Sequence, residues 1–485
     1  MIISRRFCQP TCDEFLFPPL FPSPDLNLWN NHTGNTMAVQ EYPSWLASFL
    51  ADTNPPPKLY AWSPANLDIQ SGRTENSPKD QQKLAFQNDS PSPRNRIHII
   101  GPGNIGRLYA CYMAQHANPL PITLVVHRKE LLYSWVMSEG LGIIDPVKGT
   151  VLKNKDFDVE WWTETQPDHG PIREVADGKK LRNVFVSTKA ADGLVEVDRM
   201  RRYLGWSSSV VFAQNGVCKL WPPHGPLYVA SRYSPDDEPT FSACVVKHGV
   251  SSAGPFLSVH AAPADAYIGT VFRSKRIKRH IDDPFIRYIV TSPCLNTQRV
   301  SSGELWLLQL EKLVINAAIN PLTAILRCKT GFLFTSYDTR DPLTRVLDKL
   351  LWQTSAVIQE LIYHDSSLDM VISFVQETQP HITSKQNFYK NFKNTRHKIA
   401  QRFSHPMLKS NLFAFGRKIS EHRSSMLQDM EAGRETEIRD FNGWITDMAR
   451  FLDTDLDVSV HSSLITLIER KEVLVKDELA SRLSV

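Results

Sequence analysis

The feature that most constrains the fold of this chain is an apolar run that leads directly into a glycine motif. Residues 96–100 predict a short strand, three glycines follow in the spacing G-x-G-x-x-G, and residues 104–110 predict the start of a helix. A strand before and a helix after are the context in which this motif binds a dinucleotide. The residues predicted to contact the dinucleotide are Gly101, Pro102, Gly103, Asn104, Ile105 and Gly106.

Each glycine has a separate physical role in such a turn. Gly101 allows the tight turn, Gly103 lets the backbone approach a pyrophosphate, and Gly106 lets the helix pack closely on the strand. Free N–H groups at the start of the helix then face the phosphates, and the helix dipole favours their negative charge. An ordinary glycine-rich turn between a strand and a helix is the alternative interpretation.

The residues after the second predicted strand bear on the choice of cofactor. That strand covers residues 121–126 and ends about 20 residues after the glycine turn, where NAD enzymes usually carry an acidic residue for the ribose 2′-hydroxyl. This chain has His127, Arg128 and Lys129 there. A carboxylate would repel a 2′-phosphate, whereas a cationic cluster attracts it. We therefore expect NADP(H), with Arg128 as the phosphate ligand; a solvated basic corner is the alternative.

Two further strands end in polar residues. The strand at 183–190 ends near Lys189, and the strand at 209–216 ends near Asn215. Ligands of open α/β sheets lie at the carboxyl ends of the strands, so both side chains are candidates for the cleft. Taken singly, each is more simply a structural residue, because Asn-Gly is first of all a turn signal. Further strands are predicted at 241–246, 256–260 and 266–271, the last closing the sheet.

A strongly apolar helix is predicted from residue 304 onward, and it carries a polar stripe. Lys312, Asn316 and Asn320 are four residues apart, so they form one slightly spiralling row roughly 12 Å long. Polar side chains on a buried helix are costly unless they have partners. The stripe therefore predicts either a polar network between helices or a functional site. Pro321 predicts an end or a kink of this helix.

Length and composition limit the classes of protein to consider. A chain of 485 residues exceeds one ordinary core, so two domains plus additional segments are expected. The net charge of +4 gives no support for nucleic-acid binding, which we consider unlikely. The seven cysteines have no metal-ligand spacing and are expected to be reduced thiols, and no metal site is predicted. No run of 18 apolar residues is present, so no membrane span is expected.

We divide the chain into three parts. Residues 1–94 are rich in Pro, Asn, Ser and Asp and are expected to form a flexible extension, within which residues 42–50 can dock as an amphipathic piece. Residues 95–295 predict the nucleotide-binding α/β domain. Residues 296–485 predict a helical domain with an insertion around 329–420, whose basic residues are more typical of a solvated helix face than of RNA contacts.

The amino-terminal residues also bear on the compartment. Arg5 and Arg6 precede apolar residues, as in a mitochondrial presequence, but Asp13, Glu14 and early prolines argue against one. We therefore expect a cytoplasmic protein, with a mitochondrial location as the alternative.

Several motifs together resemble the ketopantoate reductase (2-dehydropantoate 2-reductase) family. The resemblance covers residues 96 to about 472. Besides the glycine turn it rests on Lys189-Ala190, Gln214-Asn215-Gly216, K-L-x-x-N-x-x-x-N-P-L-T at 312–323, S-S-M-L-Q-D at 424–429, T-E-I at 436–438 and N-G at 442–443. It implies an α/β Rossmann domain followed by an all-α domain of the 6-phosphogluconate dehydrogenase type, with the active site between them.

The resemblance also implies a reaction and roles for residues. The reaction is hydride transfer from NADPH to a small 2-keto acid, most simply ketopantoate in pantothenate and coenzyme A biosynthesis. Lys312 would be the general acid, and Glu437 would orient the substrate and the site. The residues that would hold the substrate are Asn215, Asn316, Asn320 and Ser425, whereas Lys189 and Asn215 would lie near the nicotinamide and ribose and Arg128 would bind the 2′-phosphate.

The chain departs from the family pattern in ways that leave the exact substrate open. The family commonly has Asn where this chain has His422, and the extension and insertion are typical of a eukaryotic, fungal-type member. One alternative is therefore a reductase of another branched 2-keto acid. The other is a former reductase that serves as a binding or regulatory protein, such as one linked to mitochondrial translation. The sequence does not indicate whether the protein is a monomer or a homodimer.

Overall fold

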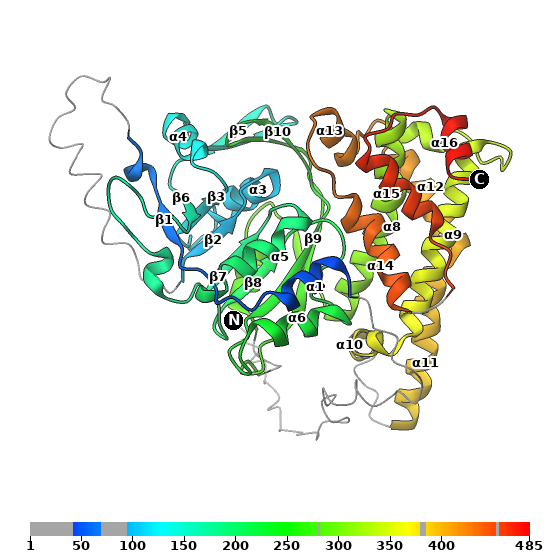
Figure 1. The fold of residues 1–485 in the computed structure, drawn as a ribbon, viewed down its shortest axis with the longest axis horizontal. Helices are drawn as coiled ribbons and strands as arrows, with labels where there is room; N and C mark the ends of the chain where they lie inside the picture. Colours follow the sequence, from blue (N-terminus) through cyan, green and yellow to red (C-terminus); the bar gives the residue numbers. More distant parts are fainter. Residues whose placement is uncertain (1–41, 69–94, 279–281, 379–384, 453–454) are drawn as a thin grey trace, which may run out of the picture. The chain divides into compact units, whose positions relative to one another are not determined.

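The computed structural model describes residues 42–68, 95–278, 282–378, 385–452 and 455–485. The part from residue 43 onward is a single compact unit that contains both the sheet and the carboxyl-terminal helices. Figure 1 shows the strands in the blue-to-green part of the chain and the long helices in the yellow-to-red part. The chain is thus an α/β sheet domain followed by a helical domain, which is the predicted fold class.

The described strands of the main sheet are nine, in the order β1-β6-β3-β2-β7-β8-β9-β12-β13. The run from β6 to β9 is parallel. Strand β1 is antiparallel to β6, β12 is antiparallel to β9, and β13 is parallel to β12. The strand order reverses at β2, so the turn after β2 lies where doubly wound sheets bind ligands. Their bounds are β1 Tyr60–Trp62, β2 Ile97–Ile100, β3 Ile122–Val126, β6 Asp158–Thr163, β7 Asn183–Val186, β8 Ser209–Phe212, β9 Thr240–Val246, β12 Ala266–Phe272 and β13 Thr297–Arg299.

The central strands are apolar on both faces, as expected for strands covered by helices on both sides. Every residue of β2, β3, β8 and β9 is buried. Helix α3 starts directly after the glycine turn, and its buried residues pack with Ile97, Ile99 and Leu124 in one core. The helices of this domain are α3 Asn104–Met113, α4 Glu130–Met137, α5 Ala190–Arg199, α6 His224–Arg232 and α7 Pro284–Thr291.

A second sheet was not predicted. It has four strands in the order β10-β11-β4-β5 among the described residues, namely Gly249–Gly254, Leu257–Ala262, Leu141–Asp145 and Thr150–Asn154. The strand predicted at 256–260 therefore exists as β11 but belongs to this sheet, not to the main one. The strand at 266–271 exists as β12, but β13 and not β12 is the edge on that side, because β13 pairs with the outer side of β12.

The predicted flexible extension is wrong for residues 43–68. Helix α1, Ser44–Ala51, lies on α6 with Leu46 fully buried, which confirms the predicted amphipathic piece. Strand β1 then pairs with β6 at the edge of the main sheet. The apolar side chains here, such as Leu59 and Trp62, provide the buried surface that the average composition of the segment conceals. The remaining residues of the extension, 1–41 and 69–94, lie outside the described residues.

The helical domain is built around α8, Ser302–Leu326. Ser301 caps the start of this helix, because its hydroxyl accepts a hydrogen bond from the Glu304 N–H at 3.1 Å. Helix α8 is buried on nearly all sides, and its apolar side chains, such as Leu305, Leu310 and Leu313, belong to the core of the helical domain. The other described helices are α9 Pro342–Tyr363, α10 Leu368–Thr378, α11 Lys385–Arg402, α12 His405–Lys418, α13 Ser425–Glu431, α14 Trp444–Phe451, α15 Ser459–Glu469 and α16 Lys476–Arg482, with a short π-helical segment at Arg439–Gly443.

Of the two effects predicted for Pro321, an end or a kink of α8, the end is wrong, because another residue replaces the hydrogen bond that proline removes. A non-proline residue at 321 would donate its N–H to the carbonyl of Ala317. In the structure, the Asn442 side-chain amide donates to that carbonyl at 3.1 Å. The same amide nitrogen lies 3.1 Å from His461 Nδ1, and burial lowers the pKa of His461 to about 3, so this ring is neutral and can accept. The helix therefore continues to Leu326.

Replacing Asn442 with leucine is expected to lower the free energy of unfolding by about 2 kcal/mol, because Ala317 and His461 lose a buried partner. Urea unfolding followed by circular dichroism would measure this change. In a Pro321→Ala background the restored N–H supplies the Ala317 carbonyl, so the same substitution should cost less. An equal cost in both backgrounds would contradict this account of the helix.

Candidate active site

The glycine turn after β2 has the geometry of a pyrophosphate site. Gly101 has φ +69°, and a Cβ there would lie 2.4 Å from Thr188 Cγ2, while a Cβ on Gly106 would lie 2.3 Å from Ser187 Oγ. These two glycines are required by packing within the protein. A Cβ on Gly103, in contrast, would meet no atom closer than 3.9 Å. The space over Gly103 is open to a ligand, as the dinucleotide prediction requires.

The other predicted residues of this turn contribute in different ways. The side chain of Ile105 packs against the domain core, so only its backbone can face a ligand. Asn104 Oδ1 accepts a hydrogen bond from Ser258 Oγ at 2.9 Å. The Pro102 carbonyl accepts one from Arg107 Nε at 2.9 Å, and another Arg107 nitrogen donates to the Gly254 carbonyl at 2.9 Å. Arg107 thus connects the glycine turn to the second sheet. The sequence motif did not reveal this role of Arg107.

Arg128 lies at the same edge of the sheet as the glycine turn. It follows β3, which pairs with β2 so that Val125 is opposite Ile100. Its side chain is exposed and forms no hydrogen bond or ion pair with the part of the chain that the structure describes. The neighbouring Lys129 instead lies with its amine 4.5 Å from the centre of the Trp62 ring. Arg128 therefore has a guanidinium available for a 2′-phosphate, and the site fits NADP(H).

Lys189 and Asn215 lie at the ends of β7 and β8, as predicted, and both contact the helical domain. Lys189 Nζ donates to Asp429 Oδ2 at 2.5 Å and to the Glu435 carbonyl at 2.8 Å. Asn215 Nδ2 donates to Glu437 Oε2 at 3.1 Å. The structure thus brings together the predicted strand-end residues and the predicted acidic residue, although they are more than 200 positions apart in sequence.

Glu437 is a carboxylate held at the junction of the two domains. It is 7% exposed, and besides Asn215 it accepts a hydrogen bond from the Ala190 N–H at 3.4 Å. Burial raises the pKa of Glu437, whereas the hydrogen bond from Asn215 and the charge of Lys189 oppose this increase. The carboxylate therefore has defined donors on the sheet side.

Lys312 projects from α8 toward the end of β9, where its amine donates to the Val246 carbonyl at 2.7 Å. Burial lowers the pKa of Lys312 to about 8, and the negative charge of Glu437 limits this decrease. The two predicted catalytic residues are thus close enough to influence each other. An amine with this pKa is protonated at neutral pH and gives up its proton readily to an oxygen that gains negative charge.

The remaining predicted residues lie on α8 and α13. Asn316 is half-buried, and Asn320 is 7% exposed, yet neither amide forms a hydrogen bond with any residue in the described ranges. Both amides are therefore available to a ligand. Ser425 is exposed in the first turn of α13, whereas its neighbour Ser424 is buried and accepts from the Leu427 N–H at 3.1 Å. Ser424 Oγ also lies 2.7 Å from Thr323 Oγ1, which fixes α13 to α8.

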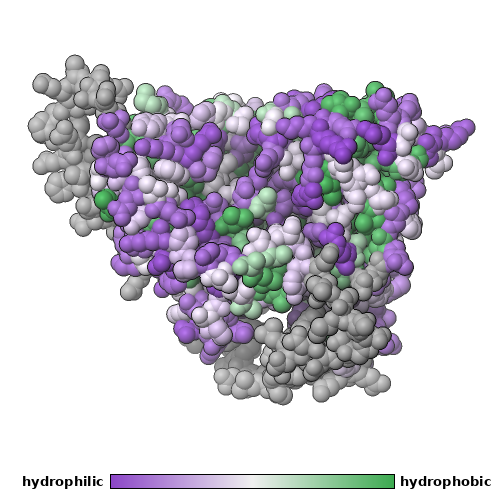
Figure 2. Space-filling view, viewed as in Figure 1, coloured by the Kyte–Doolittle hydropathy of each residue, from purple (hydrophilic) through white to green (hydrophobic). Residues whose placement is uncertain are grey.

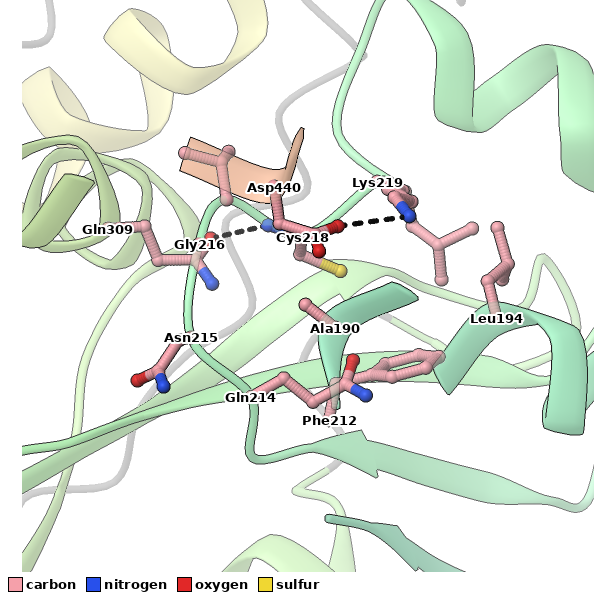
Figure 3. Close-up of a pocket in the computed structure, with 12 residues that line it drawn as sticks. Ala190, Leu194, Phe212, Gln214, Asn215, Gly216, Cys218, Lys219, Gln309 and Asp440 are labelled. Atoms are coloured by element: carbon pink, nitrogen blue, oxygen red, sulfur yellow. Dashed lines mark hydrogen bonds and ion pairs between the residues drawn. The ribbon is translucent and has the colours of Figure 1, made fainter. Parts of the chain in front are cut away.

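A small cavity of about 30 Å³ lies beside Asn215, and some of the residues that line it were not predicted from the sequence (Figure 3). Lys219 Nζ and Asp440 Oδ1 form an ion pair of 3.2 Å across it, so the loop after β8 is joined to the helical domain a second time. The Cys218 N–H donates to Gln309 Oε1 at 3.4 Å. The cavity has room for one or two water molecules. No sequence pattern singled out Lys219, Gln309 or Asp440, because each pairs with a residue far away in the chain.

The described residues give no sign of two other kinds of site. No helix within them has both the length and the apolar character needed to cross a membrane. Nor do three or more His, Cys, Asp or Glu side chains gather within these ranges in a way that could hold a metal ion. The face drawn in Figure 2 is mainly hydrophilic, with apolar areas in several separate places.

Comparisons with known proteins agree with this geometry. The sequence matches the family described as Ketopantoate reductase PanE/ApbA over residues 97–272, and Ketopantoate reductase PanE/ApbA C terminal over residues 304–472. It is 62% identical over 457 residues to ketoisovalerate reductase BEA2 of Gibberella fujikuroi and 59% identical over 464 residues to a ketoisovalerate reductase of Beauveria bassiana. Both alignments cover 92% of this chain and 100% of the relative.

The similarity to solved structures concerns the fold. A PanE/ApbA family ketopantoate reductase from Ralstonia eutropha JMP134 superposes with a TM-score of 0.51 at 17% identity, covering 79% of this chain and 99% of that one. The same succession of an α/β domain and a helical domain is therefore known from experiment.

Proposed function

Since this chain belongs to the ketopantoate reductase family, we propose that it reduces 2-ketoisovalerate to 2-hydroxyisovalerate with NADPH. The observation that carries the choice of substrate is the identity of 62% with a ketoisovalerate reductase along its full length. The motifs in the sequence favoured ketopantoate as the first candidate. The two relatives support the alternative instead, a different branched 2-keto acid.

The geometry of Lys312 supports a reductive mechanism. NADPH supplies the hydride that adds to the carbonyl carbon of the keto acid. Negative charge then grows on the carbonyl oxygen, and the Lys312 amine donates a proton to it, which produces the hydroxyl group. Asn316, Asn320 and Ser425 hold the carboxylate of the substrate and the oxygen that becomes its hydroxyl group. Glu437 keeps the Lys312 amine largely protonated until it reacts.

The residues around the glycine turn support NADPH as the cofactor. Gly103 leaves room for the pyrophosphate. The guanidinium of Arg128 has no partner among the described residues and would bind the 2′-phosphate. Lys189 and Asn215 lie at the ends of the next two strands, where they would hold the nicotinamide end of the cofactor.

A panel of 2-keto acids assayed with NADPH and with NADH tests the proposal. Ketopantoate carries a hydroxymethyl group where 2-ketoisovalerate has a hydrogen atom, and a site shaped for the smaller acid discriminates against such an added group by roughly 10- to 100-fold. We expect kcat/KM with 2-ketoisovalerate and NADPH to exceed that with ketopantoate by such a factor. A preference for ketopantoate would instead support the first candidate. Absence of turnover with every keto acid would favour a binding or regulatory protein.

The pH dependence of the reaction follows from the pKa of Lys312. Reduction requires the protonated amine, and burial lowers its pKa to about 8. We expect kcat/KM for reduction to be constant below about pH 8 and to fall about tenfold per pH unit above it. The reverse oxidation needs the neutral amine and should rise with pH over the same range. Rates measured between pH 6 and 10 check this, and a reduction rate that is flat up to pH 10 would rule out Lys312 as the acid.

A further inference from the structure

The ion pair between Lys189 and Asp429 joins the two domains at the edge of the site. Asp429 lies in α13 and its side chain is 10% exposed. One of its carboxylate oxygens accepts from Lys189 Nζ at 2.5 Å, and the other accepts from Arg434 Nε at 2.9 Å. Lys189 is the residue directly before α5, so the pair connects the end of β7 with the helical domain.

We propose that Asp429 is a positioning residue that holds the cleft closed around the cofactor through Lys189. The proposal rests on the proposed function in that it takes the cleft to be the NADPH site. Asp429 lies four residues after Ser425, so both lie on one face of α13. The ion pair therefore fixes the helix that carries a substrate residue relative to the strand ends that receive the nicotinamide.

Two observations indicate that this pair acts between the domains and not within the helical domain. Helix α13 is already attached to α8 by the 2.7 Å contact between Ser424 and Thr323, which does not involve Asp429. Arg434, the second partner of Asp429, belongs to the same domain and has a largely exposed side chain. Loss of the Asp429 charge therefore leaves α13 in place but removes the ion pair of Lys189, which keeps its hydrogen bond to the Glu435 carbonyl. The charge of Lys189 also acts on the carboxylates of Glu437 and Asp440.

The expected effect is on binding more than on the chemical step. If only a fraction of the molecules has the closed cleft, the apparent affinity for ligand falls by that fraction. Asp429 is buried, although the Lys189 side chain is 38% exposed. Removing the buried charge is expected to lower the closed fraction about tenfold. Once both ligands are bound they span the cleft themselves, so kcat at saturation should change little.

The test compares Asp429→Asn with Glu431→Gln, a control in the same helix whose carboxylate pairs with exposed Arg423. For Asp429→Asn we expect the dissociation constant of NADPH, measured by its fluorescence, and the KM for 2-ketoisovalerate each to rise about tenfold, with kcat within about threefold. The control should match the unmodified protein in all three. Unchanged NADPH binding in Asp429→Asn, or a loss confined to kcat, would overturn the proposal.

A double-mutant cycle with Lys189→Met identifies the partner. In that background Asp429→Asn should change NADPH binding less than twofold, and an undiminished effect would show that Asp429 does not act through Lys189.

Hydrogen exchange of the Ala190 amide, which donates to Glu437, gives a readout without turnover. Exchange should be faster in Lys189→Met even if Asp429→Asn fails to fold. Unchanged exchange in Lys189→Met would also contradict a positioning role of the Lys189–Asp429 ion pair. Absence of turnover in the unmodified protein would instead count against the proposed function alone.

Discussion

Replacing Lys312 with alanine is expected to lower kcat for keto-acid reduction by about 10²- to 10⁴-fold, the usual contribution of a positioned general acid. The amine donates to the Val246 carbonyl at 2.7 Å, and the negative charge of Glu437 favours its protonated form. Alanine removes the proton donor and leaves the glycine turn and Arg128 intact. The dissociation constant of NADPH should therefore stay within about threefold.

The matched control is Lys247→Ala. Lys247 follows β9 directly, and its amine lies over the Tyr267 ring with its side chain exposed. Because the charge of Lys247 lowers the pKa of Lys312, its removal should move the fall of the pH profile slightly to higher pH and leave kcat nearly unchanged. Equal losses of kcat in the two variants, or a Lys312→Ala protein that turns over at the normal rate, would exclude the proposed mechanism.

Replacing Arg128 with leucine is expected to raise the KM for NADPH by about 10- to 100-fold. A charge-assisted hydrogen bond to a phosphate contributes about 1.5–3 kcal/mol, and each 1.4 kcal/mol is a factor of ten in binding. The exposed Arg128 has no partner among the described residues that would compensate for the loss. The KM for NADH should not rise, because NADH has no 2′-phosphate.

The control for this prediction is Arg182→Leu. Arg182 is also exposed, but it precedes β7 and so lies at the opposite end of the parallel strands. It should leave both KM values unchanged. Steady-state kinetics with NADPH and NADH at one ionic strength check the pair of variants. An Arg128→Leu protein with an unchanged ratio of the two KM values would show that the basic corner is only solvated surface.

The parts of the fold that follow local patterns could be predicted from the sequence. The continuous apolar runs of β2, β3, β7 and β8 indicated a parallel sheet, and the regular spacing of Lys312, Asn316 and Asn320 placed them on one side of α8. Helix α1 was also indicated by its amphipathic pattern. These features depend on residues that are neighbours in the chain.

The features that escaped prediction depend on distant partners. Pro321 is tolerated in α8 because of Asn442, more than 100 positions later. The second sheet consists of short strands with glycine and serine, such as Gly249–Gly254, which carry little apolar pattern of their own. Asp429 stood in a motif that was recognised, but its role required knowledge of Lys189, 240 residues away.

Strand β1 has a consequence for how the protein can be handled. The match to the family begins at residue 97, whereas β1 covers Tyr60–Trp62 and forms the outer hydrogen bonds of β6. A version of the chain shortened to the family match would leave the N–H and C=O groups of β6 unpaired beside exposed tryptophans. An exposed edge strand with unpaired backbone groups can pair with strands of other molecules. The shortened chain should therefore precipitate or self-associate, although the residues proposed to bind the cofactor and the substrate are all present.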